Sequence, residues 1–285
     1  MSFEFQINSK YPFLLKNTVL SHGWFQLAPW EWERDNLLLR RTEKLPDNSF
    51  VIVEMKQENQ YTLNTTIING NENVSSYHKN IVTRINRWLS LEWNPDEAID
   101  TSKQIDKNIA DYIMQGGGRF LRGTTFYEDL LKTICTIYCS WSRTKNMVQS
   151  LYNDLGNGSS PTPSEIFSSD ENYLTKKLKL GFRSKVMIEI TKDLLEKKLI
   201  NSEGQETNKT TYTNLLSIKG IGPYTASHSM LLLHDFSKIP VDSEVSNYLK
   251  TNYNLMPNQI ADYFNPWGKY KFFGYKIRRI LDQPT

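Results

Sequence analysis

The chain has 285 residues, of which 39% are hydrophobic and 23% are charged, a balance typical of globular proteins. This length allows one large domain or two modest ones with a sizeable core. The formal net charge is +3. So small an excess does not by itself indicate a nucleic-acid partner, because a local basic face matters more than the total charge.

Cysteine and histidine usage excludes several kinds of metal site. The only two cysteines are Cys135 and Cys139, which we interpret as thiols in a reducing compartment. Two thiols cannot hold a four-cysteine iron–sulfur cluster or a cysteine-rich zinc site. The four histidines have no metal-binding spacing. Neither a signal peptide nor a membrane-spanning run is present, so we expect an intracellular protein, in the cytoplasm or nucleoid of a prokaryote or the nucleus of a eukaryote.

The first part of the chain predicts an antiparallel β-meander over about residues 11–73. The evidence is a series of strand-like segments, DNLLLRRTE (35–43), SFVIVEMKQ (49–57) and YTLNTTIINGNE (61–72). The second is rich in β-branched residues and follows the turn signal LPDNS, and the third ends in a turn signal of its own.

After this region the spacing of apolar residues becomes helical. The run NIVTRINRWLSL (80–91) predicts one helix, and residues 124–156 predict a long helical run that ends at Gly156. Helical segments follow on both sides of Gly181, and again from residue 211 to the C terminus. We therefore predict an α+β fold, with an N-terminal antiparallel β domain at 1–80 and a mostly helical domain at 81–285.

A helical hairpin is predicted at about residues 212–234. Gly220 and Gly222 lie between two helical segments and allow backbone conformations that side chains would forbid. Pro223 suits the first position of the second helix. The free N–H groups at that helix start could bind a phosphate without reading sequence. The same pattern also fits an ordinary helix–helix corner, because short glycine motifs are common.

A longer sequence motif favours the phosphate-binding hairpin over the ordinary helix–helix corner. IKGIG (218–222) is followed, after an apolar link, by PVD (240–242). This pattern resembles the helix-hairpin-helix DNA glycosylases, with Lys219 in place of a proline. The resemblance spans most of the chain and is strongest over residues 119–245. Residues 18–41 resemble, more weakly, the additional β domain of the 8-oxoguanine and alkyladenine branches.

Two sequence features indicate which branch of that superfamily the chain resembles. No cysteine follows Cys139, which disfavours the branches that carry an iron–sulfur cluster. Bifunctional members have a lysine two residues after the second hairpin glycine, where this chain has Tyr224. A phenol cannot form an imine, so the resemblance implies a monofunctional glycosylase that hydrolyses the N-glycosidic bond. The alternatives are a bifunctional glycosylase/AP lyase that uses another lysine, and a non-catalytic protein that binds damaged DNA.

The resemblance also implies the residues of the site. Asp242 would be the catalytic carboxylate, which stabilises positive charge on the sugar and orients water; it could instead only cap the helix that follows. Gly220, Gly222 and Tyr224 would contact DNA phosphate through backbone N–H groups. In the family, hairpin carbonyls bind a monovalent cation, K⁺ or Na⁺; the matching carbonyls here are those of Leu216, Ile218 and Ile221.

Further DNA contacts are expected outside the hairpin. Tyr138 aligns with the residue that fills the space left by a flipped base, although a core tyrosine would fit the helical pattern equally well. Arg143 could face the opposite strand or be a solvated surface residue. The segment GFRSK places Arg183, Ser184 and Lys185 at a helix start, which could meet phosphate or be a capped helix with a solvated face. The expected partner is lesion-containing double-stranded DNA bound by a monomer, with no required cofactor. An aromatic-rich pocket would favour alkylated purines, whereas the N-terminal resemblance favours 8-oxoguanine.

Overall fold

The N-terminal part of the chain forms one antiparallel sheet in the computed structural model, which describes residues 2–68 and 74–282. The strand order is β1-β5-β4-β3-β2. The strands are β1 (Phe3–Asn8), β2 (Trp30–Glu33), β3 (Leu38–Lys44), β4 (Phe50–Gln57) and β5 (Thr62–Ile68). Strands β3, β4 and β5 correspond to the three segments of the predicted meander, whereas β2 was not predicted as a strand. The turn signal expected at residues 69–72 lies outside the described residues.

Strand β1 corrects the sequence prediction, which began the β region at residue 11. It pairs antiparallel with β5, from Phe3 opposite Ile67 to Asn8 opposite Thr62. Phe3, Phe5 and Ile7 alternate with polar residues in FEFQIN and are the less exposed side of the strand, so its apolar alternation was a signal that the prediction overlooked. The pairing depends on a partner strand about sixty residues away in the chain.

The rest of the chain is mostly helical, and the expected α+β fold is confirmed. The helices are α1 (Leu15–Val19), α2 (His78–Trp88), α3 (Asp96–Ile105), α4 (Lys107–Met114), α5 (Phe126–Thr136), α6 (Trp141–Ser150), α7 (Pro163–Phe167), α8 (Arg183–Glu196), α9 (Tyr212–Leu216), α10 (Pro223–Leu231), α11 (Ser243–Tyr253), α12 (Ile260–Tyr263) and α13 (Lys271–Leu281). A short 3₁₀ helix, η1 (Gly23–Gln26), precedes β2. None of the described helices is long and apolar enough to cross a membrane.

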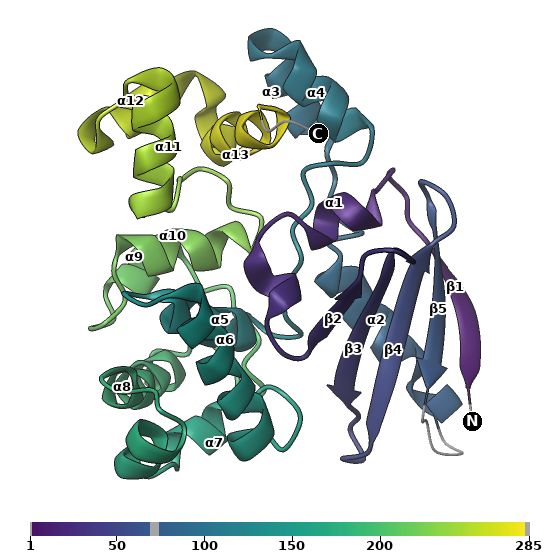
Figure 1. Cartoon of the computed structure of the whole chain (residues 1–285), viewed down its shortest axis with the longest axis vertical. Helices are drawn as coiled ribbons and strands as arrows, with labels where there is room; N and C mark the ends of the chain where they lie inside the picture. The colour runs from purple at the N-terminus through teal and green to yellow at the C-terminus, as the bar shows by residue number, and fades with distance from the viewer. Residues whose placement is uncertain (1, 69–73, 283–285) are drawn as a thin grey trace.

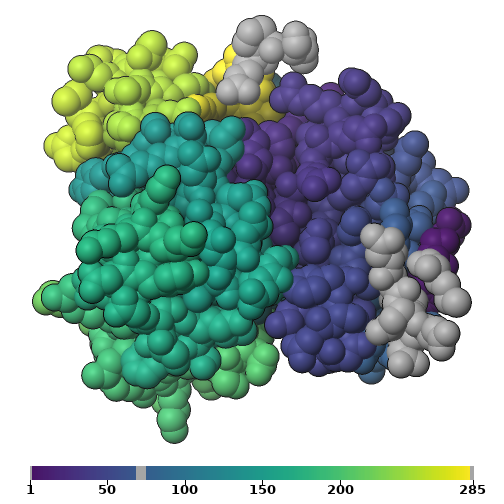
Figure 2. All heavy atoms as spheres, turned by 60° about the horizontal axis from the view of Figure 1, so that its bottom comes forward, coloured from purple at the N-terminus to yellow at the C-terminus, as the bar shows by residue number. Residues whose placement is uncertain are grey.

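The helices are arranged in groups beside the sheet (Figure 1). Helix α2 lies behind the sheet and buries Ile81, Ile85 and Trp88. Helices α5, α6 and α8 lie together on the far side from β1, with α9 and α10 next to them. Helix α13 lies beside α3 and α4, and α11 and α12 lie on the other side of α13. The buried apolar side chains of the sheet and of these helices form one continuous core. Figure 2 shows the β layer and the helical body meeting along a seam on one face.

A buried charge network joins the sheet to the helices. The Arg41 guanidinium from β3 is 2% exposed and lies over the rings of Trp30 and Trp88, at 4.7 and 4.9 Å from their centroids. It donates two hydrogen bonds to the Glu128 carboxylate on α5, at 3.0 and 2.8 Å. Lys132, one turn further along α5, donates to the same carboxylate at 2.7 Å. Each buried charge thus has a partner, without which its burial would cost several kcal/mol.

The predicted long helix at 124–156 is broken in the structure. Helix α5 ends at Thr136 and α6 begins at Trp141. Tyr138, between them, has a left-handed backbone with φ of 48°. Ser140 caps α6 by accepting a hydrogen bond from the Arg143 N–H at 3.4 Å. An apolar period cannot reveal such a break, because both helices keep their apolar residues on the core side.

Candidate active site

The predicted hairpin consists of α9, a glycine-containing turn and α10. Gly220 has φ of +99°, and a Cβ at this position would lie 3.2 Å from a Val186 methyl group. Both the backbone conformation and the packing against α8 therefore require glycine. Gly222 is the N-cap of α10 in an extended conformation, and no atom lies within 4 Å of the Cβ that it lacks. Pro223 is the first residue of α10, as predicted.

The start of α10 offers N–H groups to a ligand. Gly222 and Pro223 are exposed, and no side chain among the described residues caps this helix. The first amides of a helix have no partner within the helix, and the helix dipole places partial positive charge there. The turn can therefore approach an anion closely through its backbone.

Asp242 lies at the start of α11, on the other side of the link that follows α10. Its carboxylate accepts a hydrogen bond from the Val245 N–H at 2.8 Å, so the residue is the N-cap of α11. It is exposed to solvent. The helix-capping interpretation is thus correct for the folded protein, and among the described residues the second carboxylate oxygen, Oδ2, accepts no hydrogen bond.

Tyr224, on the first turn of α10, points toward the same region as Asp242. Burial raises the pKa of its hydroxyl, a hydrogen bond to Thr136 lowers it, and the Asp242 carboxylate raises it. Its ring stacks on His228, one turn further along α10, with centroids 5.9 Å apart. The position at which the sequence resemblance implies a lysine in bifunctional glycosylases thus carries a phenol whose pKa the Asp242 carboxylate affects.

Sequence reasoning missed Lys276, which α13 brings to the same place. Burial and, to a smaller extent, Arg279 lower the pKa of its ammonium, Glu244 and Asp242 oppose them, and the net pKa is about 8. Lys276 also acts electrostatically on His228 and on His22 of the N-terminal part. The C-terminal run of basic and aromatic residues contains several lysines and arginines, and nothing in its sequence distinguishes Lys276 from the others.

Tyr138 is the most exposed large hydrophobic residue described, at 94%, so the core-tyrosine interpretation is wrong. It lies at the tip of the turn between α5 and α6, close in sequence to Thr136, the hydrogen-bond partner of Tyr224. The turn after α5 therefore lies next to the hairpin. Arg143, on the first turn of α6, is exposed, as both interpretations of this residue require.

Arg183 does not meet solvent, so its predicted contact with phosphate is wrong. Its guanidinium is 1% exposed and donates to the carbonyl oxygens of Ile134, at 3.3 Å, and Ile137. The Ile134 carbonyl, which also accepts the Ile137 N–H at 3.3 Å, belongs to the end of α5, and the Ile137 carbonyl belongs to the turn after it. Arg183 therefore fixes the turn that carries Tyr138.

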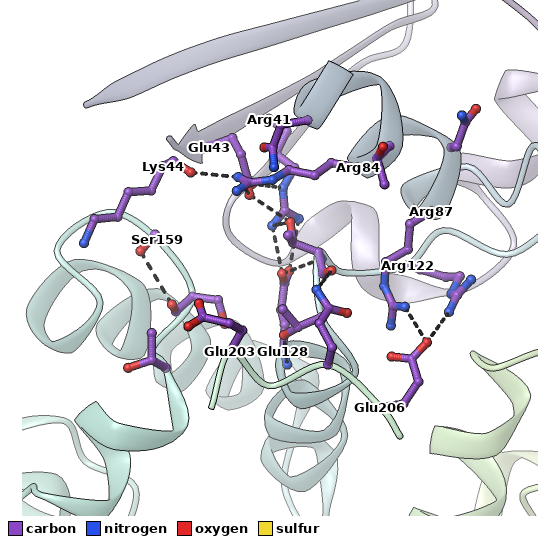
Figure 3. A pocket seen from close by; sticks show the side chains of 18 of the residues that line it. Arg41, Glu43, Lys44, Arg84, Arg87, Arg122, Glu128, Ser159, Glu203 and Glu206 are labelled. Atoms are coloured by element: carbon purple, nitrogen blue, oxygen red, sulfur yellow. Dashed lines mark hydrogen bonds and ion pairs between the residues drawn. The ribbon is translucent and has the colours of Figure 1, made fainter. Parts of the chain in front are cut away.

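A cavity of about 980 Å³ lies elsewhere, between the β layer and the helical body. Figure 3 shows Arg84 near Glu43, and Arg87 and Arg122 pointing toward Glu206. Five cationic side chains and five carboxylates line it, so their charges balance: Arg41, Lys44, Arg84, Arg87, Arg122, Glu43, Glu92, Glu128, Glu203 and Glu206. It contains neither Asp242 nor the hairpin, and its balanced charge does not favour an ionic ligand.

Comparisons with known proteins give the class to which this arrangement corresponds. No family model matches the chain. A structure of MBOgg1 in complex with a low-affinity DNA ligand aligns with a TM-score of 0.69 and 20% identity, over 98% of this chain and 96% of that one. The 8-oxoguanine glycosylase/lyase of Clostridium acetobutylicum gives 0.69 and 19%, over 97% and 96%. The 3-methyladenine DNA glycosylase of Archaeoglobus fulgidus gives 0.68 and 18%, over 96% and 98%.

These alignments show that the chain has the fold of the helix-hairpin-helix DNA glycosylases, as the sequence resemblance predicts. The chain is also 29% identical over 158 residues to a curated relative, the N-glycosylase/DNA lyase of Saccharomyces cerevisiae. The matched stretch is 47% of this chain and spans about two-fifths of the length of that relative, 41%. The fold and the likeness thus agree on the class, while the activity must be argued from the site.

Proposed function

We propose that the protein is a DNA glycosylase that flips a damaged or mispaired base out of lesion-containing double-stranded DNA and hydrolyses its N-glycosidic bond. The observation that carries the proposal is the convergence of Asp242 and Tyr224 beside a hairpin whose α10 amides have no cap. A phosphate-binding backbone and a carboxylate are the two parts that such a reaction needs.

In the proposed reaction, Asp242 acts on the sugar. Breaking the bond to the base leaves positive charge on the deoxyribose, and a nearby carboxylate stabilises this charge. The same carboxylate orients a water molecule that attacks C1′, and the base leaves with a proton. The capping hydrogen bond from Val245 occupies one oxygen at 2.8 Å and fixes the orientation of the carboxylate.

The other proposed contacts with DNA involve the hairpin and the region where α5 ends and α6 begins. Backbone N–H groups at Gly220, Gly222 and Tyr224 hold the DNA phosphate, and Tyr138 fills the space left by the flipped base. Arg143 faces the opposite strand. Carbonyls of Leu216, Ile218 and Ile221 would hold a monovalent cation; the Ile218 carbonyl already accepts the Ile221 N–H at 3.1 Å, which leaves one of its two lone pairs. The protein would act as a monomer inside the cell.

The Asp242→Asn variant tests the role of the carboxylate. Asparagine keeps the N-cap of α11, so the fold and DNA binding should persist. We expect single-turnover base release to fall by at least 10²-fold, because the amide cannot stabilise the charged sugar. Release would be measured on duplexes with alkylated, oxidised and deaminated bases. A variant that releases base at the wild-type rate would refute this role, and lesion binding without release by the wild type would identify a non-catalytic sensor.

Monofunctional chemistry is tested by strand cleavage. Because Tyr224 cannot form an imine, we expect an intact abasic strand without alkali and no complex trapped by borohydride. Trapping by the wild type would contradict hydrolysis and fit the lyase activity in the name of the yeast relative. Repeating the experiment with Lys276→Met would then identify the amine, since Lys276 is the lysine that the structure brings near Asp242.

A further inference from the structure

The turn that carries Tyr138 is attached to the helical body by hydrogen bonds on both sides of its tip. Before the tip, Arg183 donates to the two carbonyl oxygens described above. After the tip, the Cys139 thiol donates to the Cys135 carbonyl oxygen at 3.0 Å. These partners belong to α8 and α5, so they fix the turn relative to the helical body but not relative to the N-terminal part of the chain.

Trp141, the first residue of α6, connects the same turn to the N-terminal part. Its ring lies so close to η1 that a Cβ on Gly23 would be 2.5 Å from the Cη2 atom and 2.6 Å from the Cζ2 atom of the indole. Glycine at position 23 therefore lets the ring rest directly against the backbone. At the other end of η1, the indole N–H donates to the Gln26 Oε1 atom at 2.9 Å. These two contacts fix both the place and the orientation of the ring.

The 3₁₀ helix η1 is itself attached to α5 and α10. Trp24, in the middle of η1, is 3% exposed, and its indole N–H donates to Asp129 Oδ1 on α5 at 2.9 Å. The Trp24 ring centroid lies 5.0 Å from that of His228 on α10, which lies 5.9 Å from that of Tyr224. A series of direct contacts thus runs from the turn between α5 and α6, through Trp141 and η1, to the second helix of the hairpin.

A side chain that fills the space of a flipped base is effective only if the turn behind it does not yield. Extrusion of a paired base costs a few kcal/mol in lost stacking and pairing. Tyr138 is 94% exposed and has φ of 48°, so its own contacts with the protein do not hold it in place. Its position must be maintained by the residues beneath it, as for any functional side chain that has to be preorganised.

We propose that Trp141 is a positioning residue that supports the Tyr138 turn against η1 and thereby assists extrusion of the base from duplex DNA. This inference rests on the proposed glycosylase function and on the insertion of Tyr138. Trp141 takes no part in breaking the N-glycosidic bond. Its importance should therefore depend on the energy needed to unpair the base, and a base that is already unpaired should scarcely require it.

A purely structural role of Trp141 leads to a different expectation. If the indole only filled space where α6 meets η1, its removal would lower stability and slow base release from every substrate to the same extent. The two roles can therefore be distinguished by comparing paired with unpaired lesions.

The experiment measures single-turnover base release from two duplexes of the same sequence, with the lesion opposite its pairing base or opposite an abasic-site analogue. The lesion is whichever of 8-oxoguanine, 7-methylguanine and hypoxanthine the wild type releases fastest. Trp141→Ala should slow release from the paired duplex by roughly 10-fold, through the lost stacking of Tyr138, and from the unpaired duplex by less than about twofold. Equal slowing on both duplexes would overturn the proposal.

A double variant tests whether Trp141 acts through Tyr138. When Tyr138→Ala is already present, adding Trp141→Ala should slow release from the paired duplex by less than about twofold, because residues that act as one unit are not additive. A further loss of roughly 10-fold would show that the two residues act independently, which would contradict the proposal.

Two more variants control for packing. Trp141→Phe keeps an aromatic ring on α6, but the shorter ring cannot reach Gly23 or donate to Gln26, so the same selective loss is expected in a protein that folds. Trp32→Ala removes another partly buried tryptophan, from β2, and should leave the ratio of paired to unpaired release at its wild-type value. A wild type that releases no base from either duplex would contradict the proposed function. Release by the wild type, with an unchanged ratio in both Trp141 variants, would contradict only the role of Trp141.

Discussion

Tyr138 combines two unfavourable features at the scale of a single residue. Its side chain is 94% exposed, and its backbone has φ of 48°, in the left-handed region. The left-handed conformation costs a non-glycine residue about 1–2 kcal/mol. Arg183 maintains the turn by donating to the Ile134 and Ile137 carbonyls. A large apolar side chain held out in this way serves folding poorly, which agrees with its proposed insertion into DNA.

The Tyr138→Ala variant should therefore separate stability from activity. We expect the free energy of unfolding to change by less than about 0.5 kcal/mol, because the ring makes little contact in the folded protein. Loss of stacking should reduce single-turnover base release from duplex DNA by roughly 10- to 100-fold, from about 1–3 kcal/mol per stacked base. Tyr138→Phe should retain activity, and Tyr61→Ala, at a 49% exposed tyrosine of the β region, should have no effect. Wild-type release by Tyr138→Ala would show that the ring does not insert.

The hairpin shows at the scale of an element how two glycines of one motif serve different purposes. Gly220 is required by its φ of +99° and by the closeness of α8. Gly222 has a φ of −91°, which any residue can adopt, and open space where its Cβ would lie. Folding therefore requires the first glycine but not the second, which agrees with the proposed contact of Gly222 with DNA phosphate.

A matched pair of alanine variants tests this difference. Gly220→Ala should destabilise the protein by roughly 1–3 kcal/mol, because it combines backbone strain with a contact at 3.2 Å. Gly222→Ala should leave the denaturation midpoint near that of the wild type, yet weaken binding to undamaged duplex DNA at low salt. Equal loss of stability in both variants would show that Gly222 is a folding residue as well.

At the scale of the whole molecule, the Arg41–Glu128 pair connects the sheet to the helical body. Burial alone would raise the pKa of the Glu128 carboxyl, but Arg41 and Lys132 together hold it well below its usual value. A lowered carboxyl pKa stabilises the fold at pH values above the unfolded pKa of about 4.5. That contribution is lost as the pH falls below this value.

Glu128→Gln should lower the free energy of unfolding at neutral pH by about 3–5 kcal/mol, because Arg41 and Lys132 would keep their buried charges without the carboxylate. Chemical denaturation at a series of pH values would measure this effect, and the difference from the wild type should shrink as the pH falls below about 4.5. Glu189→Gln, in the exposed pair with Lys185 at 3.9 Å, should change stability by less than about 0.5 kcal/mol. A neutral effect of Glu128→Gln would mean that the network does not hold the two parts together.

Some of these features could be predicted because they depend on local sequence. Gly220 and Pro223 favour the hairpin turn, and Asp242 caps the helix that follows it, since dihedral preferences and capping act within a few residues. The antiparallel strands β3 to β5 could be predicted from β-branched and apolar residues and from turn residues. The α+β fold class could be predicted in the same way.

Other features were decided by tertiary structure alone. The period of apolar residues could not reveal the break at Tyr138 or tell the buried Arg183 from a surface arginine, because each depends on a partner from another element. The approach of Lys276 to Asp242, across 34 positions of the chain, is set by how α13 packs beside α11 and α10. The sequence alone determined the hairpin and the position of Asp242 after it. Tertiary packing decided that the Lys276 ammonium lies near Asp242, because the neighbours that set the pKa of a group come from distant parts of the chain.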